Sequence, residues 1–344
     1  MTPSNSRIAL ILGAAGGVGG EVADALARHG WTIRALVRDP SKASGGKTSR
    51  GKGWTWITGD AMDRAAVVAA AEGASIIVHA VNPPGYRGWG KLVLPMIDNT
   101  IAAAQVSGAR ILLPGTIYNY GPSAYPLLSE ASPQRPKTRK GAIRVAMEAR
   151  LEAAAARGVR SLIVRAGDFF GPRPGNNWFS QGLVKPGQPL KAITYPGQSG
   201  VGHAWAYLPD LAETFARLAD REAELPAFAR FHFDGHWDAD GTAMIWAIRR
   251  AAGAPKLPVK SLPWGLLALM APFNETLREL VEMKPLWRAD IRLDNRKLVA
   301  FLGEEPRTPL DQAVAATLAG LGVVTPAAAR RARSPSRPRT SRAA

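Results

Sequence analysis

The chain has 344 residues, of which 46% are hydrophobic, and its formal net charge is +17 at neutral pH. This length and apolar content suffice for one large α/β domain or for a nucleotide-binding domain with a smaller lobe. The chain contains no cysteine, which excludes disulfides and thiolate chemistry. The N-terminal segment MTPSNSR has no apolar signal region, and the apolar stretch 262–273 is too short and too interrupted by proline to span a bilayer. These features predict a soluble, cytoplasmic protein without a membrane segment.

The excess positive charge is concentrated in part at the C-terminus. Residues 325–344 hold six arginines and no acidic residue, among proline, serine and alanine. Such a composition cannot bury a core, so we expect a disordered basic tail. No aromatic residues accompany the basic run, so non-specific attraction of anions is expected there and dedicated nucleic-acid binding is not.

A glycine-rich turn near the N-terminus is the most informative stretch. The apolar run Ile8–Leu12 reads as a buried strand, and a helical pattern with Val18 and Val22 on one face follows it. Three glycines at Gly-x-x-Gly-x-x-Gly spacing lie between them, and such a turn lets the backbone approach a pyrophosphate closely. The phosphate would lie at the helix N-terminus. We therefore predict a dinucleotide site at Gly13, Gly16, Gly17, Val18 and Gly19.

The ends of the next two strands are expected to read the adenosine. The second strand, Thr32–Val37, is followed by Arg38, and an arginine at this place pairs with a 2′-phosphate, which favours NADP over NAD. The alternative is a surface arginine, with Asp39 capping the next helix. The third strand, 54–58, is followed by Asp60, whose carboxylate suits an adenine amino group or a helix cap equally well.

A fourth strand, 75–81, is mostly apolar and contains His79, which we interpret as a core histidine. Ala80 and Val81 at its end are predicted to contact the cofactor, and the loop that starts at Asn82 should lie beside the nicotinamide ribose. A helix over 90–107 and a fifth strand over 110–113 continue the alternation. The alternating strands and helices predict an α/β fold, a Rossmann-type doubly wound parallel sheet with right-handed crossovers.

At this point the chain resembles an extended short-chain dehydrogenase/reductase of the NAD-dependent epimerase/dehydratase type. The resemblance rests on six segments: GAAGGVG (13–19), VRDP (37–40), GD (59–60), TIYNYGP (116–122), RAGDFFGP (165–172) and AYLPDLAET (206–214). It implies a cofactor across the carboxyl edge of the sheet and a substrate held by a small C-terminal lobe. We expect residues 1–165 to form the cofactor domain, with segments around 201–235 returning to it, and 166–324 mainly the lobe.

The resemblance also implies a Ser or Thr after the fifth strand and a Tyr-x-x-x-Lys pair on the next helix. Thr116 matches the first, but no Tyr-x-x-x-Lys occurs in the chain. In the helix register anchored on Glu148, Lys140 stands at the tyrosine position and Arg144 at the lysine position. Lys140 or Tyr118 is then the predicted proton donor, and Arg144 a ligand of ribose hydroxyls, since arginine stays protonated. The alternative is that Lys140 and Arg144 only bind phosphate or ribose and that Tyr118 packs under the cofactor.

The lobe carries no motif that identifies a substrate. Asn176, Asn177, Trp178 and Phe179 suit a small ligand that is partly polar and partly apolar. The segment HFDGHWD (232–238) has histidines four apart, but its pattern indicates strand and turn, so we predict no metal site. The helix over 139–157 is apolar enough on one side to allow a homodimer.

Two functions from different classes remain open. The first is an NADP-dependent oxidoreductase or epimerase, with NAD as an alternative cofactor, that acts on a small carbonyl or hydroxyl compound through a non-standard active site. The second is a non-catalytic NADP(H) sensor, which needs the glycines and Arg38 but no proton donor. The missing Tyr-x-x-x-Lys favours the sensor.

Overall fold

The computed structural model describes residues 7–41, 51, 53–83, 85, 87–173, 175 and 177–325. Most of residues 41–53, Asn176 and nearly all of the predicted basic tail lie outside this part of the chain. In the described part, no helix has the length and apolar character needed to cross a membrane.

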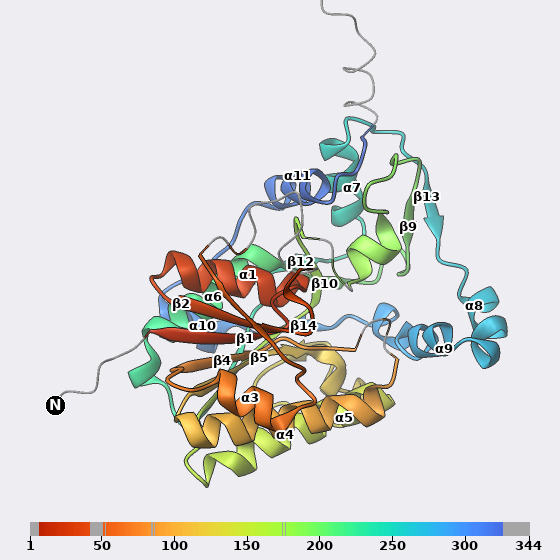
Figure 1. Ribbon diagram of the computed structural model, residues 1–344. Coiled ribbons are helices and arrows are strands. Elements are labelled where there is room, and N and C mark those ends of the chain that lie inside the picture. The colour runs from red at the N-terminus through yellow and green to blue at the C-terminus, as the bar shows by residue number, and fades with distance from the viewer. Residues whose placement is uncertain are drawn as a thin grey trace, which may run out of the picture.

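A seven-stranded sheet forms the centre of the molecule, and all of its neighbouring strands run parallel (Figure 1). The strand order is β11-β7-β5-β4-β1-β2-β3. The strands are β1 (Ile8–Leu12), β2 (Thr32–Val37), β3 (Thr55–Thr58), β4 (Ile76–His79), β5 (Arg110–Thr116), β7 (Ser161–Ala166) and β11 (Phe228–His232). The predicted doubly wound parallel sheet is therefore confirmed, and β1 and β2 match their predicted ranges.

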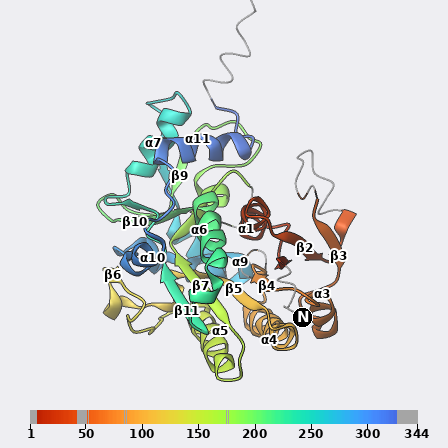
Figure 2. The same cartoon turned by 90° about the vertical axis from the view of Figure 1, so that its left-hand side faces the viewer.

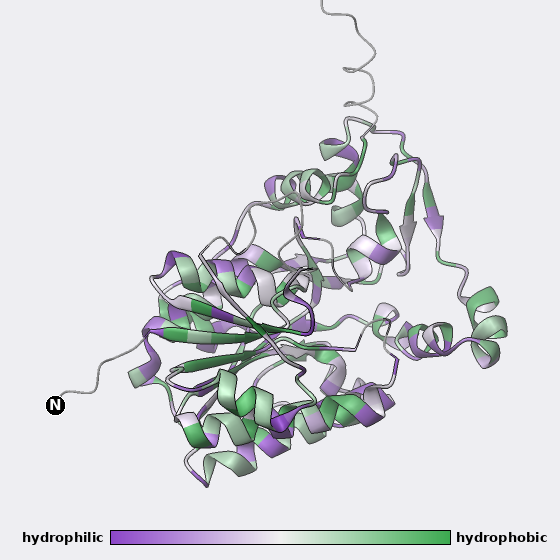
Figure 3. Cartoon of the chain, in the orientation of Figure 1, coloured by the Kyte–Doolittle hydropathy of each residue, from purple (hydrophilic) through white to green (hydrophobic). Residues whose placement is uncertain are grey.

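Helices cover both faces of this sheet. On one face α1 (Gly17–Arg28) packs against α6 (Leu208–Asp220), which is visible from the side in Figure 2. On the other face lie α3 (Arg64–Ala70), α4 (Trp89–Ser107) and α5 (Arg139–Ala155). Strands buried on both faces need apolar side chains throughout. Figure 3 shows this as predominantly green strands between helices with purple outer positions.

The remaining elements build a smaller lobe beside the carboxyl edge of the sheet. Its parts are a three-stranded sheet, two strand pairs and the helices that pack on them. The strands are β8 (Asp168–Phe170), β10 (His203–Tyr207), β12 (His236–Asp238), β9 (Ile193–Tyr195) paired with β13 (Val259–Ser261), and β6 (Leu127–Leu128) paired with β14 (Arg292–Leu293). The helices are α7 (Ala243–Ala251), α8 (Trp264–Met270), α9 (Glu275–Val281) and α11 (Leu310–Gly320), whereas α10 (Arg296–Leu302) packs against β11 at the edge of the large sheet.

The segment 201–235 divides between the two parts of the molecule. Helix α6 and strand β11 return to the large sheet, as predicted, whereas β10 pairs with β8 and β12 in the lobe. The chain therefore crosses between sheet and lobe several times, which fixes the lobe over the carboxyl edge. That edge includes the β1–β4 boundary, where the strand order changes direction and where ligands bind in folds of this type.

Candidate functional site

A cavity opens at this boundary between β1 and β4. The turn after β1 contributes Gly16, Gly17 and Val18, and the end of β4 contributes Ala80 and Val81. All five are residues that the sequence predicts to bind a cofactor, although they come from two segments about sixty positions apart. Thr116 and Arg144 line the same cavity, so the structure joins the predicted cofactor residues to two of the predicted catalytic ones.

Gly13 and Gly19 allow backbone segments next to the cavity to approach one another closely. Gly13 has a φ of +93°, and a Cβ there would lie 2.6 Å from the carbonyl oxygen of Ala80. A Cβ at Gly19 would lie 2.3 Å from the carbonyl oxygen of Gly13. A side chain at Gly13 would push the turn away from the residues after β4, and one at Gly19 would push α1 away from the turn. The turn therefore brings the N-terminus of α1, with its unbonded N–H groups, to the cavity, where the residues fit a pyrophosphate.

The predicted adenosine-binding residues lie at the same edge of the sheet. Arg38 is exposed directly after β2. Asp39 follows it and accepts hydrogen bonds from the backbone N–H of Ser41 at 3.0 Å and from its hydroxyl at 2.6 Å, which fits the local capping role considered above. Asp60 is exposed and accepts from Met62 N at 2.9 Å, but Asp63 is the residue that caps α3.

Thr116 ends β5 and lines the cavity. The carbonyl oxygen of Thr116 accepts a hydrogen bond from Arg165 at 2.6 Å, which holds the strand end in place. The Oγ1 atom accepts from Tyr118 N at 3.3 Å. A hydroxyl that accepts one hydrogen bond still carries a hydrogen of its own, which Thr116 could donate to a ligand oxygen.

Glu148, the residue on which the predicted helix register is based, fixes the rotational position of α5. Its carboxylate accepts from Asn119 at 2.9 Å and from Gln134 at 3.1 Å, and it forms an ion pair with Arg165 at 2.7 Å. Burial alone would lower the pKa of Arg165, but Glu148 raises it above the ordinary value, so the guanidinium stays charged. This buried network fixes α5 against β5 and β7, and it places Arg144 one turn earlier at the cavity.

Arg144 is 9% exposed, and its guanidinium lies over the ring of Trp89 at 5.2 Å. An arginine in this place has the charge and the donor geometry to bind hydroxyls or an anionic group, and it cannot act as a proton shuttle. Its position in the cavity agrees with the predicted ligand-binding role.

His79 faces the same cavity as a neutral acceptor. The hydroxyl of Thr100 donates to Met96 O at 3.0 Å, so its oxygen accepts from His79 Nδ1 at 2.8 Å. This assigns the hydrogen to Nδ1 and leaves a lone pair on Nε2, which has no hydrogen-bond partner among the described residues. Burial, together with the charge of Arg144, lowers the pKa of His79 to about 3. The predicted core histidine therefore also lines the site.

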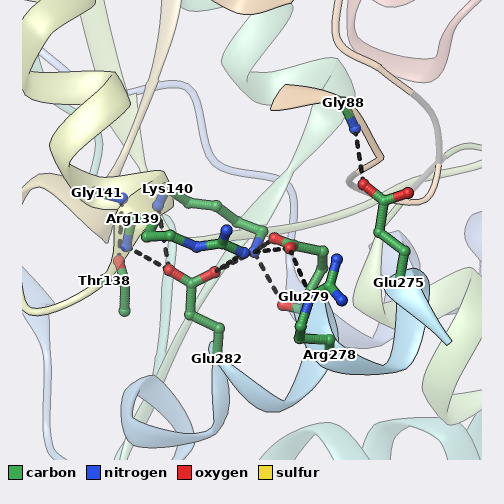
Figure 4. Close-up of polar contacts among 9 residues, drawn as sticks. All are labelled: Gly88, Thr138, Arg139, Lys140, Gly141, Glu275, Arg278, Glu279 and Glu282. Atoms are coloured by element: carbon green, nitrogen blue, oxygen red, sulfur yellow. Dashed lines mark hydrogen bonds and ion pairs between the residues drawn. The ribbon is translucent and has the colours of Figure 1, made fainter. Parts of the chain in front are cut away.

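Lys140 differs from its predicted role as a proton donor. It is 1% exposed, and its ammonium bonds to carboxylate oxygens of Glu279 and Glu282 and to Glu279 O at 3.1 Å (Figure 4). Arg139 joins the same carboxylates. The three hydrogens of the Lys140 ammonium are directed at Glu279 and Glu282. The residue at the family's tyrosine position thus connects α5 to α9.

A third acidic residue of α9 makes a separate contact. Glu275 accepts a hydrogen bond at 3.2 Å from the backbone N–H of Gly88, the residue that caps α4 (Figure 4). Glu279 and Glu282 bind the start of α5. We call the pair α8 and α9 the roof helices. Carboxylates of α9 and of the residue that follows it bind the starts of both α4 and α5.

The cavity continues past Thr116 into a part lined by aromatic side chains. Tyr118 and Trp178, which the sequence singles out, lie here together with Trp89 and Phe169, which it does not. Asn177 also lines both parts of the cavity, and its amide oxygen accepts from Ser180 N at 2.8 Å. The segment RAGDFFGP at the end of β7 could have pointed to Phe169 as a lining residue, whereas no sequence pattern around Trp89 indicates its place in the cavity.

The segment HFDGHWD forms strand and turn, as predicted. His232 ends β11, Gly235 has a φ of +62°, and His236 begins β12. The acidic side chains bind elsewhere, since Asp234 pairs with Arg292 at 3.0 Å and Asp238 accepts from backbone N–H groups at the start of α7. In the described part of the chain, no cluster of acidic residues and histidines suits a metal ion.

Comparison with protein families agrees with this geometry. A model of the NAD dependent epimerase/dehydratase family matches residues 9–231, which is well over half of the chain. The chain belongs to this family. Over 205 residues it is 30% identical to the uncharacterized protein y4nL of Sinorhizobium fredii (strain NBRC 101917 / NGR234), a match that covers 54% of this chain and 57% of y4nL. The chain therefore matches little more than half the length of that relative.

Two solved structures share the fold over nearly the whole chain. MoeE5 in complex with UDP-glucose and NAD has a TM-score of 0.69 at 18% identity, covering 95% of this chain and 99% of MoeE5. UDP-glucose 4-epimerase from Bifidobacterium longum, in complex with NAD+ and UDP, has a TM-score of 0.70 at 16% identity, covering 90% and 97%. At such identities the likeness shows the fold of the epimerase/dehydratase family and leaves the substrate open.

Proposed function

We propose that this chain is an NADP-dependent oxidoreductase or epimerase that acts on a small hydroxyl or carbonyl compound. One observation carries the proposal: a single cavity joins the glycine turn, the end of β4, Thr116 and Arg144. A nicotinamide cofactor supplies hydride transfer when bound. The glycine turn would hold its pyrophosphate, and Arg144 would bind its ribose hydroxyls or an anionic group of the substrate.

Thr116 and Tyr118 are the groups proposed to contact the reacting oxygen. The Thr116 hydroxyl has a free hydrogen to donate to a carbonyl oxygen, and Tyr118 lines the adjoining part of the cavity. A phenol can exchange a proton with an alkoxide, whereas the Lys140 ammonium is bonded to Glu279 and Glu282. We expect Thr116→Val to lower kcat by about 10²-fold, and Tyr118→Phe by about 10²-fold or more.

The cofactor preference is proposed from Arg38, which is exposed after β2 and follows the positional rule for a 2′-phosphate. Calorimetric titration with NADPH and NADH tests it on the wild type and on Arg38→Ala. We expect NADPH to bind the wild type more tightly and the variant to lose about tenfold in NADPH affinity only. Arg28→Ala is the control, because Arg28 lies in the last turn of α1, at the opposite end from the glycine turn. Equal loss for both nucleotides would contradict the preference.

A non-catalytic NADP(H) sensor is the second candidate, and the pairing of Lys140 with Glu279 and Glu282 favours it. Binding titrations do not separate the two functions, but turnover does. If NADPH binds and no carbonyl or alcohol substrate is turned over, and Tyr118→Phe binds NADPH unchanged, the sensor is the better description.

A further inference from the structure

The part of the cavity beyond Thr116 is bounded mainly by aromatic rings. Trp89, Trp178, Phe169 and Tyr118 line it. Aromatic walls stack on flat or cyclic ligands and exclude water, and a few polar groups then orient the ligand. Here Thr116 would be such a group, at the end where the cofactor cavity begins.

The charges in this part of the cavity are balanced. Arg144 contributes a guanidinium and Asp168 contributes a carboxylate. Asp168 lies 2.9 Å from His203 Nε2, so its charge is held in place at the far end of the cavity. A diphosphate needs several cations or N–H donors directed at its oxygens, whereas this lining offers one cation and an opposing carboxylate.

A wall of buried rings ends the cavity on the lobe side. Trp178 contacts Trp264 at 6.0 Å and Trp287 at 5.4 Å between ring centroids, and His203 stacks on Trp287 at 3.8 Å with an interplanar angle of 9°. All four side chains are less than 9% exposed. We call these residues the aromatic partition.

A second cavity lies on the other side of the partition. Tyr195, Gln198, Trp264 and Arg288 are among the residues that line it. In the described part of the chain it shares no lining residue with the cavity at Thr116. The interior of the lobe therefore holds space, but that space is separated from the reaction centre by closely packed tryptophans.

We infer that the substrate is a compact, single-ring secondary alcohol or the corresponding ketone, without a nucleotide diphosphate. This inference rests on the proposed function. The ring lies between Trp89 and Trp178, with its oxygen at Thr116. Oxidation removes a hydride from the carbinol carbon and a proton from its hydroxyl, forming the C=O bond. The oxidised nicotinamide cofactor accepts the hydride, and solvent accepts the proton.

Steady-state oxidation of cyclohexanol and of UDP-glucose with NADP+ tests the inference, on the wild type, Trp178→Ala and Trp246→Ala. Trp246 is the control because it lies on α7 and is 46% exposed. We expect turnover of cyclohexanol, a KM raised about tenfold or more in Trp178→Ala only, and neither turnover nor calorimetric binding of UDP-glucose.

The outcomes separate this inference from the proposed function. Binding or oxidation of UDP-glucose by the wild type overturns the inference of a compact substrate. An unchanged KM for cyclohexanol in Trp178→Ala also overturns it. NADPH binding with no oxidation of cyclohexanol overturns the substrate class and leaves cofactor binding intact. A wild type that binds neither NADPH nor NADH refutes the proposed function itself.

Discussion

Replacing Lys140 with methionine removes the charge that joins α5 to the roof helices while keeping most of the side-chain volume. The ammonium is 1% exposed and bonds to Glu282 Oε2 at 2.5 Å as well as to Glu279. Without it, two carboxylates face each other in a partly buried space. Breaking a buried ion pair costs about 3–5 kcal/mol. We expect the lower end, about 3 kcal/mol, because the Glu282 side chain is 17% exposed and Arg139 still neutralises Glu279.

The loss should depend on pH through Glu279. Burial raises the pKa of this carboxyl, but Lys140 and Arg139 outweigh burial and hold the pKa below its ordinary value of 4.5. Such a group stabilises the wild type above pH 4.5, and this stabilisation is lost as the pH falls through the folded-state pKa. In Lys140→Met the Lys140 contribution that lowers the pKa of Glu279 is gone and only that of Arg139 opposes burial, so Glu279 takes up a proton more easily than in the wild type. The deficit of the variant should therefore be largest near neutral pH and shrink towards pH 4.

Urea unfolding at several pH values, with NADPH binding and turnover measured on the same samples, tests this prediction. Arg139→Met is the matched control, since Arg139 bonds to the same Glu279 but its side chain is 68% exposed, and its loss should cost less than about 1 kcal/mol. The reasoning is refuted if Lys140→Met unfolds within about 0.5 kcal/mol of the wild type while its turnover falls more than about 10²-fold. That result would identify Lys140 as the proton donor after all.

Three further predictions concern other parts of the fold. Gly13→Ala should weaken NADPH affinity about tenfold or more, because its Cβ would lie 2.6 Å from Ala80 O. The control Gly30→Ala has a φ of +82° and no atom within 4 Å, so it should cost only about 1 kcal/mol of stability. Equal effects of the two variants on NADPH titrations would contradict this. Glu148→Gln should lower the free energy of unfolding by about 3 kcal/mol by leaving Arg165 buried without its charge partner, and exposed Glu152→Gln should be neutral in the same urea series. Burial, together with the charge of Arg165, lowers the pKa of His232 to about 3, so this histidine stabilises the fold above pH 6.5 and the stabilisation is lost towards pH 3. His232→Gln should therefore reduce the slope of the unfolding free energy against pH between pH 6 and pH 4 by about 1.4 kcal/mol per pH unit. An unchanged slope would refute the lowered pKa of His232.

Local patterns in the sequence were sufficient for the sheet and for the glycine turn after β1. The apolar runs of β1 and β2 and the glycine spacing between β1 and α1 are set by neighbours in the chain, so their ranges could be predicted. Arg144 lines the cavity because one buried anchor, Glu148, fixes the register of its helix, and its role as a ligand-binding residue stays a prediction.

The failures involve partners far apart in the sequence. Lys140 pairs with Glu279 across 139 positions, and no periodicity or spacing links the two. Trp89 lines the substrate side of the cavity because α4 starts beside it, and the partition depends on the meeting of four separate segments. Side-chain pairing over such separations is determined by the tertiary fold, which the sequence patterns do not specify.

The connection between Lys140 and the roof helices also limits how this active site can change. Installing the family's usual phenol by Lys140→Tyr would leave Glu279 and Glu282 facing a neutral ring, with no cation in the place of the ammonium. Conversely, neutralising the two carboxylates alone would leave a buried lysine without a counter-ion. A return to the ordinary tyrosine chemistry therefore requires coordinated changes in α5 and at the end of α9, and single substitutions on either side should first pass through a less stable protein.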